Sequence, residues 1–274
     1  MGLMESKKGI IFGVSNTRGI AYGIAQELYN AGAQIAFTYA NEAMKKRVTP
    51  IAESMNSKLI IECDVTDENQ IKKVYEEYKK AYGNLDFVVH AVAFANRDDL
   101  TGEFINTSKE GWDLAMGVSA YSLVAISRVA KDYMKNGGSI FALTYLGSER
   151  VVANYNIMAV AKAALECSMR YLADNLGKLN IRVNCISAGP VKTLASSAIG
   201  GLGKMLHTAI LKAPLKRNVT LEDIGKTGLY LASDLSSGVT GEVIHVDCGC
   251  HSVYASIDEM DAMTQGLQTT EQNS

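Results

Sequence analysis

The sequence predicts an α/β protein in which seven parallel strands form one doubly wound sheet in a single domain. Short apolar runs of four to six residues alternate with longer amphipathic stretches along the chain. Runs of this kind are typical of parallel strands that are buried on both faces. A glycine-containing loop follows the first apolar run, and in this fold class such a loop indicates a ligand site beyond the carboxyl ends of the strands.

The first half of the chain alternates strand and helix. Apolar runs at 9–12, 34–39 and 59–63 predict the first three strands. The stretches that follow them, 20–31, 43–55 and 68–82, have the longer spacing of helices, and the third is highly charged. A fourth apolar run, 87–90, predicts the fourth strand.

The second half continues the same alternation. The pattern Thr107-Ser-Lys-Glu110 predicts a capping box that opens a long helix. Apolar runs at 139–144, 182–186 and 243–246 predict the last three strands, and a long helix rich in small residues is expected at 155–176. We find no repeat and no linker, so residues 1–256 are predicted as one domain, followed by a polar tail at 257–274.

Composition narrows the class of function. The 274 residues carry 27 Lys and Arg against 29 Asp and Glu, a net charge of −2. This balance argues against broad electrostatic binding to nucleic acid, which needs a basic excess. The chain has 24 glycines and only 3 prolines, a ratio that favours glycines at turns and ligand contacts over a chain rich in linkers.

The expected compartment is the cytoplasm. The longest uncharged runs, 28–41 and 114–127, have 14 residues, whereas a membrane helix needs about 20. The first residues lack the apolar segment and cleavage site of a secretory signal. Five scattered cysteines indicate reduced thiols, and neither they nor the four histidines show the spacing of a metal site. We therefore expect no membrane span and no metal.

The loop from Gly13 to Gly19 joins the first predicted strand to a helix that begins at Ile20. Glycines let the backbone approach a pyrophosphate, while the helix N-terminus supplies N–H donors and the positive end of its dipole. The spacing differs from G-x-G-x-x-G, and a plain tight turn also explains a pair of glycines. The position of the loop in the first βαβ unit favours a dinucleotide site of the Rossmann type.

The identity of the dinucleotide is less directly encoded. Asp64 follows the third strand, where its carboxylate either accepts from an adenine amino group or caps the helix that includes Glu68. The second strand ends in Thr38-Tyr-Ala-Asn41, without the acidic residue that holds the ribose of NAD and without an adjacent base for a 2′-phosphate. We expect NADH rather than NADPH.

Tyr155 and Lys162 are the residues best placed for chemistry. Seven positions apart on a helix, they share a face and lie roughly 10 Å apart along the axis. Lys162 stands among small apolar residues, where an ammonium group needs a polar partner such as the ribose hydroxyls of a coenzyme. The alternative is that Lys162 extends to solvent and Tyr155 packs at an interface.

Three motifs together resemble the bacterial enoyl-acyl-carrier-protein reductases, a divergent branch of the short-chain dehydrogenases/reductases. They are Tyr145-x9-Tyr155-x6-Lys162, the widened glycine loop ending in Gly19-Ile20-Ala21, and Ser187-Ala-Gly-Pro-Val-Lys-Thr193-Leu-Ala195. The resemblance extends from about Lys8 to His251.

This resemblance implies NADH-dependent reduction of the carbon–carbon double bond of trans-2-enoyl-acyl-carrier-protein thioesters, the last reductive step of type II fatty acid elongation. It implies that Tyr155 stabilises the enolate oxygen, that Lys162 binds the nicotinamide ribose, and that Tyr145 belongs to the catalytic group and lines the substrate site. Ala95 would touch the substrate. The implied coenzyme contacts are Gly13, Gly19, Ile20, Asp64, Val65, Val92, Lys162, Val191, Lys192, Thr193, Leu194 and Ala195.

The resemblance also implies partners. The substrate arrives on an acyl-carrier protein, and residues 193–204 have the small, apolar composition of a substrate lid. A homotetramer is expected, with the helix around 159–167 supplying part of an interface.

Two other functions are compatible with the fold class. A ketoacyl reductase or another short-chain alcohol dehydrogenase would carry Y-x3-K and an upstream Ser after the fifth strand, and Tyr145 with Y-x6-K argues against it. A non-catalytic regulator that senses a dinucleotide would leave Tyr155 and Lys162 unexplained.

Overall fold

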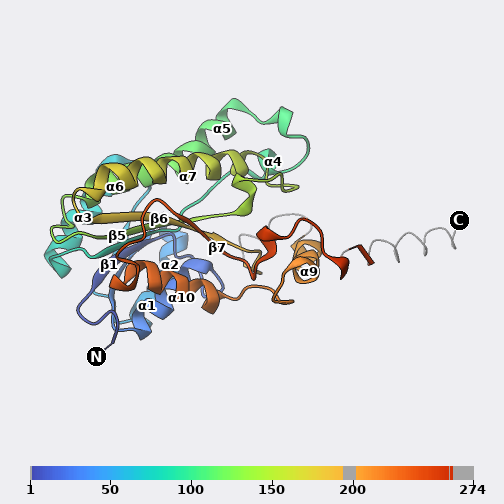
Figure 1. The fold of residues 1–274 in the computed structure, drawn as a ribbon. Helices are drawn as coiled ribbons and strands as arrows, with labels where there is room; N and C mark the ends of the chain where they lie inside the picture. Colours follow the sequence, from blue (N-terminus) through green and yellow to red (C-terminus); the bar gives the residue numbers. More distant parts are fainter. Residues whose placement is uncertain (1, 194–201, 259, 262–274) are drawn as a thin grey trace, which may run out of the picture.

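The computed structural model describes residues 2–193, 202–258 and 260–261 (Figure 1). Its centre is a parallel sheet of seven strands in the order β3-β2-β1-β4-β5-β6-β7. This arrangement confirms the predicted fold class. The strands are β1 (Lys8–Phe12), β2 (Gln34–Tyr39), β3 (Ile60–Glu62), β4 (Phe87–His90), β5 (Gly138–Thr144), β6 (Ile181–Ala188) and β7 (Val243–Val246).

Helices cover both faces of the sheet (Figure 1). One face carries α1 (Ile20–Asn30), α2 (Glu42–Ser54) and α10 (Leu221–Ala232). The other carries α3 (Glu68–Tyr82), α6 (Ser122–Ala130) and α7 (Asn156–Gly177). The remaining helical segments are α4 (Arg97–Leu100), η1 (Phe104–Asn106), α5 (Lys109–Met116), the π-helical turn η2 (Gly117–Tyr121), η3 (Leu146–Ser148), α9 (Leu202–Lys212), η4 (Asp234–Ser236) and η5 (Cys250–Ser252).

Alternate residues of each strand enter two separate hydrophobic cores. In β1, Ile10 packs in the core beneath α3, α6 and α7, whereas Ile11 packs in the core beneath α1, α2 and α10. Both side chains are fully buried. Burial on both faces explains why the strands have continuous apolar runs rather than an alternation of apolar and polar residues.

The predicted capping box is wrong by one residue. Ser108 is the N-cap of α5, and its Oγ accepts a hydrogen bond from the Gly111 backbone N–H at 2.9 Å. Thr107 instead closes η1 by donating to the Phe104 carbonyl at 2.7 Å. Since the third residue after Ser108 is a glycine, it has no side chain to return a hydrogen bond to the cap, so a capping box does not form.

The long helix expected after the capping pattern is present. It runs through α5, η2 and α6 from Lys109 to Ala130 and is long and apolar enough to cross a membrane by length and composition. More than half of its most apolar window is buried inside the protein. Part of this helix packs in the core with α3 and α7, as expected for a core helix of a globular domain.

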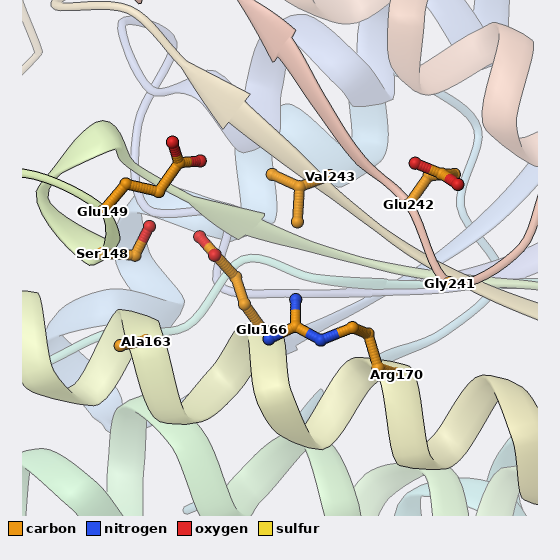
Figure 2. A pocket seen from close by; sticks show the side chains of 8 residues that line it. All are labelled: Ser148, Glu149, Ala163, Glu166, Arg170, Gly241, Glu242 and Val243. Atoms are coloured by element: carbon orange, nitrogen blue, oxygen red, sulfur yellow. The ribbon is translucent and has the colours of Figure 1, made fainter.

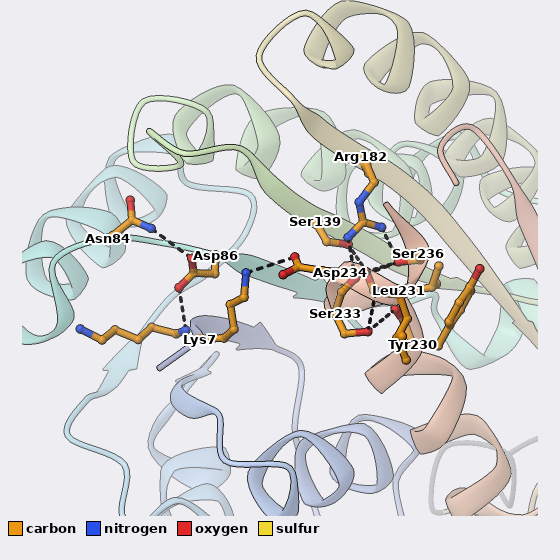
Figure 3. A network of polar contacts seen from close by, with 12 residues as sticks. Lys7, Asn84, Asp86, Ser139, Arg182, Tyr230, Leu231, Ser233, Asp234 and Ser236 are labelled. Atoms are coloured by element: carbon orange, nitrogen blue, oxygen red, sulfur yellow. Dashed lines mark hydrogen bonds and ion pairs between the residues drawn. The ribbon is translucent and has the colours of Figure 1, made fainter. Parts of the chain in front are cut away.

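Polar contacts close the amino-terminal edge of the sheet (Figure 3). Arg182 donates to the Ser236 hydroxyl at 2.6 Å and to the Ser233 carbonyl at 3.1 Å, which ties β6 to the end of α10. Ser139 donates to the Leu231 carbonyl at 2.6 Å. At the surface, Lys7 lies 3.2 Å from the carboxylate of Asp234, next to a small hollow of about 240 Å³.

Candidate active site

The carboxyl ends of the strands gather most of the predicted site residues. Because the strands are parallel, the loops that follow them meet at one edge of the sheet. The strand order reverses between β1 and β4, and Gly13 and Val92 lie in the loops after these two strands. Tyr145 follows β5, and Val191 lies in the segment after β6. A ligand in an open α/β sheet is expected at this reversal.

The backbone conformation and packing at position 13 require a glycine, whether or not a ligand is bound. Its φ is +100°, and a Cβ built there would lie 2.3 Å from the carbonyl oxygen of Ala91. The backbones that leave β1 and β4 therefore touch at the point where the strand order reverses. Any other residue would strain the backbone and push these two loops apart.

Gly19 is different, because the surrounding chain would accept a side chain there. Gly19 is the N-cap of α1 with φ −90°, and a Cβ would reach the Asn16 carbonyl oxygen only at an ordinary contact distance of 3.4 Å. No side chain caps α1 and its first turn contains no acidic residue. The missing side chain leaves space at a helix N-terminus whose N–H groups favour an anion. This part of the site fits a dinucleotide pyrophosphate.

A turn follows β3, and the side chain of Asp64 stabilises it. One carboxylate oxygen of Asp64 accepts from the backbone N–H of Thr66 at 2.9 Å and from its hydroxyl at 2.7 Å. The N-cap of α3 is Asp67, which accepts from the Asn69 N–H at 2.8 Å, so the alternative in which Asp64 caps this helix is wrong. Asp64 is exposed at the edge of the sheet, and Val65 beside it is buried.

The loop after β4 is fixed by the π-helical turn η2. The buried Ser119 hydroxyl lies 2.9 Å from the backbone N–H of Phe94 and 3.1 Å from its carbonyl oxygen. Since one hydroxyl holds both polar groups of Phe94, the backbone between Val92 and Ala95 is anchored to the helix. Val92 and Ala95 are both partly exposed at this edge.

Tyr145 and Tyr155 form one aromatic pair. Their ring centroids are 5.0 Å apart and their planes meet at 72°, an edge-to-face arrangement. Tyr155 lies at the N-cap of α7, between Asn154 and Asn156, which both have positive φ. Burial raises the pKa of Tyr145 to about 12, and the nearby Cys250 and Asp247 add to the effect. Burial, followed by Tyr145 and Glu166, also raises the pKa of Tyr155. Both hydroxyls therefore keep their protons at neutral pH.

Gly147 makes room for this pair, and the sequence analysis did not identify it. A Cβ at Gly147 would lie 2.5 Å from the Tyr155 ring and 3.5 Å from the Tyr145 ring. A glycine three residues after the end of β5 is a visible signal in the sequence. The need for a glycine there becomes clear only in the three-dimensional structure, because the ring beside Gly147 belongs to Tyr155, eight positions further along the chain.

Lys162 is buried, so the alternative that it extends to solvent is wrong. Only 5 % of the residue is exposed, and its Nζ donates to the Leu143 carbonyl at 2.7 Å. Burial lowers the pKa of Lys162 to about 8, against the opposing effects of Cys185 and Glu166. The chain thus supplies one polar partner for the ammonium group, the Leu143 carbonyl. At neutral pH the lysine is largely charged.

The segment after β6 is described only in part. Val191 packs against the core beneath α1, α2 and α10, Lys192 is exposed, and Thr193 is partly buried. Leu194 and Ala195, together with residues up to 201 of the expected lid, lie outside the described residues, as does most of the expected polar tail. The helix α9 begins at Leu202, inside the stretch interpreted as a lid.

A protein-family model described as Enoyl-(Acyl carrier protein) reductase matches residues 13–251 of the chain. The chain belongs to the enoyl-acyl-carrier-protein reductase family. It is 52% identical over 252 residues to "Enoyl-[acyl-carrier-protein] reductase [NADH] 1" of Rhizobium meliloti, an alignment that covers 92% of this chain and 93% of the relative. A Bacillus cereus enoyl-[acyl-carrier-protein] reductase [NADH] is 49% identical over 253 residues, with 92% and 99% covered.

Solved structures agree with this assignment. The Bacillus cereus enoyl-acyl carrier protein reductase with NADP+ and indole naphthyridinone superimposes with a TM-score of 0.91 at 48% identity, covering 93% of this chain and 100% of that one. The Anaplasma phagocytophilum reductase in complex with NAD gives a TM-score of 0.90 at 49% identity, with 93% and 97% covered. The family, the fold and the oxidoreductase class predicted from the sequence are thereby confirmed.

A hollow in the described part of this reductase lies beside the candidate site rather than in it. It has a volume of about 520 Å³ between α7 and the start of β7 (Figure 2). Glu166 and Arg170 point into it from α7, and Glu149 and Glu242 flank it. Neither Tyr155 nor Lys162 lines it. Since β7 is the last strand of the sheet, this hollow opens along a sheet edge.

Proposed function

We propose that this reductase uses NADH to reduce the carbon–carbon double bond of trans-2-enoyl thioesters carried by an acyl-carrier protein, in type II fatty acid elongation. The names of the Rhizobium meliloti and Bacillus cereus relatives specify NADH, in agreement with the expectation from the sequence. The observation that carries the proposal is the buried Lys162 on the helix whose N-cap is Tyr155, at the edge where the glycine loop also lies.

The coenzyme would lie across the carboxyl edge of the sheet. When bound, NADH supplies the hydride that is added to the β-carbon of the enoyl group. Gly13 and Gly19 would admit its pyrophosphate at the N-terminus of α1, next to Ile20. The other expected contacts at this edge are Asp64, Val65, Val92, Val191, Lys192 and Thr193, and Leu194 and Ala195 are proposed from the sequence alone.

Tyr155 would stabilise the charge that develops on the substrate. Addition of hydride at the β-carbon drives negative charge onto the thioester oxygen, and a donor already oriented toward that oxygen lowers the barrier. The raised pKa of Tyr155 keeps its proton available for this hydrogen bond. Tyr145 packs edge-to-face against it and would shape the acyl site together with Ala95.

Lys162 would hold the nicotinamide ribose. One of its three N–H groups is bonded to the Leu143 carbonyl, which leaves others for hydroxyl acceptors on a ligand. Its positive charge also lowers the free energy of a negative charge that develops nearby. Because the pKa of Lys162 is about 8, we expect NADH affinity to decrease as the pH rises through that value.

An acyl-carrier protein would approach near the segment 194–201. Lys192 and Lys204 are both exposed and flank this segment. An acidic carrier favours basic residues at its contact surface, since complementary charges accelerate and orient docking. We expect Lys204→Glu to raise the KM for a carrier-bound substrate several-fold while leaving the KM for a short coenzyme A thioester unchanged. Equal effects on both substrates would contradict this docking site.

The homotetramer and the cytoplasmic location also belong to this proposal. Val243 and Ile244 of the edge strand β7 are only partly buried, and the neighbouring α7 exposes Cys167 and Tyr171. An exposed edge strand beside such a face favours pairing with a second copy. Mass measurement in solution by light scattering tests the assembly, and a monomer would contradict it.

A comparison of substrates tests the proposed reaction. The protein is incubated with NADH and either crotonyl or acetoacetyl thioester, and the product is identified by mass spectrometry. We expect NADH oxidation and a saturated product with the crotonyl thioester and no turnover with the acetoacetyl thioester. The reverse preference would indicate a ketoacyl reductase. NADH binding without turnover of either thioester would indicate the dinucleotide-sensing regulator.

A further inference from the structure

Strand β4 ends in a fully buried histidine, His90, on the side of the sheet covered by α6 and α7. Its Nε2 lies 2.7 Å from the Ser122 hydroxyl, and that hydroxyl lies 2.7 Å from the Val118 carbonyl oxygen. A serine has one proton, and a carbonyl can only accept. Ser122 therefore donates to Val118 and accepts from His90, so the imidazole carries its proton on Nε2 and a lone pair on Nδ1.

The Nδ1 lone pair is buried and has no hydrogen-bond partner in the described part of the chain. Buried acceptors in native proteins are nearly always satisfied by a protein group or by an ordered water. Burial, followed by the positive charge of Lys162, lowers the pKa of His90 to about 3. The ring is therefore neutral at physiological pH, and Nδ1 stays an acceptor.

The π-helical turn η2 explains how one helix can hold both the end of β4 and the loop that follows it. It brings Ser119 against the backbone of Phe94 and is followed directly by Ser122, which binds His90. Both serines are fully buried. π-Helical turns replace regular α-helix mainly at functional sites, where the wider turn redirects side chains. Here the turn fixes both the loop after β4 and the tautomer of His90.

Lys162 approaches the same layer from α7. Its Nζ donates to the Leu143 carbonyl at 2.7 Å, and Ala142, the residue before Leu143, is the register partner of His90. The Leu143 carbonyl and the His90 ring thus come from adjacent strands at nearly the same level of the sheet. Lys162 is also the charged side chain that acts on His90. Nδ1 and Nζ are not in direct hydrogen-bond contact, because Nδ1 has no partner.

We propose that one buried water bridges His90 Nδ1 and Lys162 Nζ, and that His90 is a positioning residue for Lys162. The water donates one hydrogen to Nδ1 and accepts one N–H from Nζ. The Leu143 carbonyl takes a second N–H, and the third is then directed toward the coenzyme. The inference rests on the proposed role of Lys162 in holding NADH.

The other titratable groups near Lys162 do not replace His90 in this role. Glu166, one turn further along α7, accepts a hydrogen bond from the Thr144 hydroxyl and points into the hollow between α7 and β7, which Lys162 does not line. Burial raises the pKa of the Cys185 thiol on β6 to about 12, so this group is uncharged at neutral pH. His90 therefore supplies the unused acceptor beside the ammonium group.

The affinity for NADH, measured by fluorescence titration at two pH values, tests the proposal. Loss of the bridging acceptor lowers the pKa of Lys162, so His90→Leu weakens NADH binding about tenfold near pH 8 and less than about twofold near pH 6. His90→Asn is the matched control, because its Oδ1 offers an acceptor near the former Nδ1. It keeps the wild-type affinity within about twofold at both pH values.

Equal losses at the two pH values, or an equal loss in His90→Asn and His90→Leu, would overturn the proposal. If His90→Leu does not fold, Ser122→Ala takes its place, because it removes the acceptor that fixes the tautomer. The same pH-dependent loss is expected, at about threefold. These titrations do not depend on turnover, so they decide the inference even if the thioester comparison fails.

Nitrogen-15 NMR of the protein without coenzyme gives an independent readout. The wild-type His90 ring is expected to carry its proton on Nε2 across the neutral range, and Ser122→Ala is expected to populate the other tautomer. A wild-type ring with its proton on Nδ1, or a doubly protonated ring, would overturn the proposal, because neither form can accept a hydrogen bond from the water at Nδ1.

Discussion

The two edges of the sheet are built in opposite ways. At the amino edge, Arg182, Ser139 and Asp234 each have a hydrogen-bond or ion-pair partner elsewhere in the chain (Figure 3). At the carboxyl edge, Gly19 leaves space that nothing in the chain requires, and burial shifts the pKa of Lys162 to about 8. The contacts at the amino edge therefore stabilise the fold. At the carboxyl edge, the space beside Gly19 and the buried charge of Lys162 become favourable only when a ligand binds.

A methyl group added at each glycine of the loop distinguishes a glycine needed by the fold from one needed by the ligand. Gly13→Ala places a Cβ 2.3 Å from the Ala91 carbonyl at a φ of +100°. We expect it to lower the free energy of unfolding by about 3 kcal/mol and to abolish NADH binding. Urea unfolding and a fluorescence titration measure the two effects.

Gly19→Ala is the matched control at the other end of the loop. Its Cβ meets only an ordinary contact, so the free energy of unfolding is expected to change by less than about 0.5 kcal/mol. NADH affinity is expected to fall at least about tenfold, because the methyl group occupies space meant for the ligand. Unchanged NADH affinity in Gly19→Ala would contradict the assignment of the pyrophosphate site.

Removing the polar contacts at the amino edge should lower the free energy of unfolding and leave kcat nearly unchanged. Arg182→Ala removes a partly buried guanidinium and two hydrogen bonds, and we expect a loss of about 2 kcal/mol in the free energy of unfolding. The kcat of the folded variant is expected to stay within about twofold of wild type. Lys7→Ala, which removes only a surface ion pair, should change stability by less than about 0.5 kcal/mol. A large loss of kcat in Arg182→Ala would show that the two edges are coupled.

We expect the buried charge of Lys162 to lower the free energy of unfolding, although the same charge serves NADH binding. Its pKa of about 8 lies below the ordinary lysine value, so between these values the unfolded chain binds more protons and stability rises with pH. Below pH 8 both forms are protonated and the full penalty of burying the charge applies. We expect Lys162→Met without coenzyme to be about 2 kcal/mol more stable than wild type at neutral pH, with the difference vanishing above about pH 10. NADH affinity should drop about tenfold or more. Lower stability of the variant at neutral pH would contradict this account.

The effect expected at Gly147 is on turnover alone. A methyl group there would lie 2.5 Å from the Tyr155 ring, so Gly147→Ala must displace the ring without touching the glycine loop. We expect kcat to fall about tenfold while NADH affinity stays within about twofold. Steady-state kinetics and a binding titration separate these two quantities. A parallel loss in both would mean that Tyr155 also contributes to the coenzyme site.

The sequence predicts the strands well because each is an apolar run, and the central strands are buried on both faces. The order along the chain then places Gly13, Asp64 and Tyr145 at one edge, since parallel strands share that edge. Local hydrogen bonding is predicted less well. Thr107 and Ser108 are equally good caps by composition, and only the η1 turn, which uses the Thr107 hydroxyl, decides between them.

The parts that sequence analysis missed depend on contacts between distant residues. The π-helical turn η2 has no simple periodicity, and its use becomes clear only when Ser119 and Ser122 meet β4. His90 offered a signal, a histidine that closes the otherwise apolar run Phe87–His90. The helices α9 and α10 were not predicted, although Thr220 and Asp223 form a capping box at the start of α10.

We propose that Tyr155 performs the chemistry, whereas the glycine loop and Lys162 bind the coenzyme. The most direct test is to measure kcat and the NADH dissociation constant in Tyr155→Phe, which removes one hydroxyl and keeps the edge-to-face ring contact with Tyr145. The account predicts that kcat falls by about 100- to 1000-fold while the dissociation constant changes by less than about twofold. An unchanged kcat, or a loss of NADH affinity as large as the loss of kcat, would contradict it.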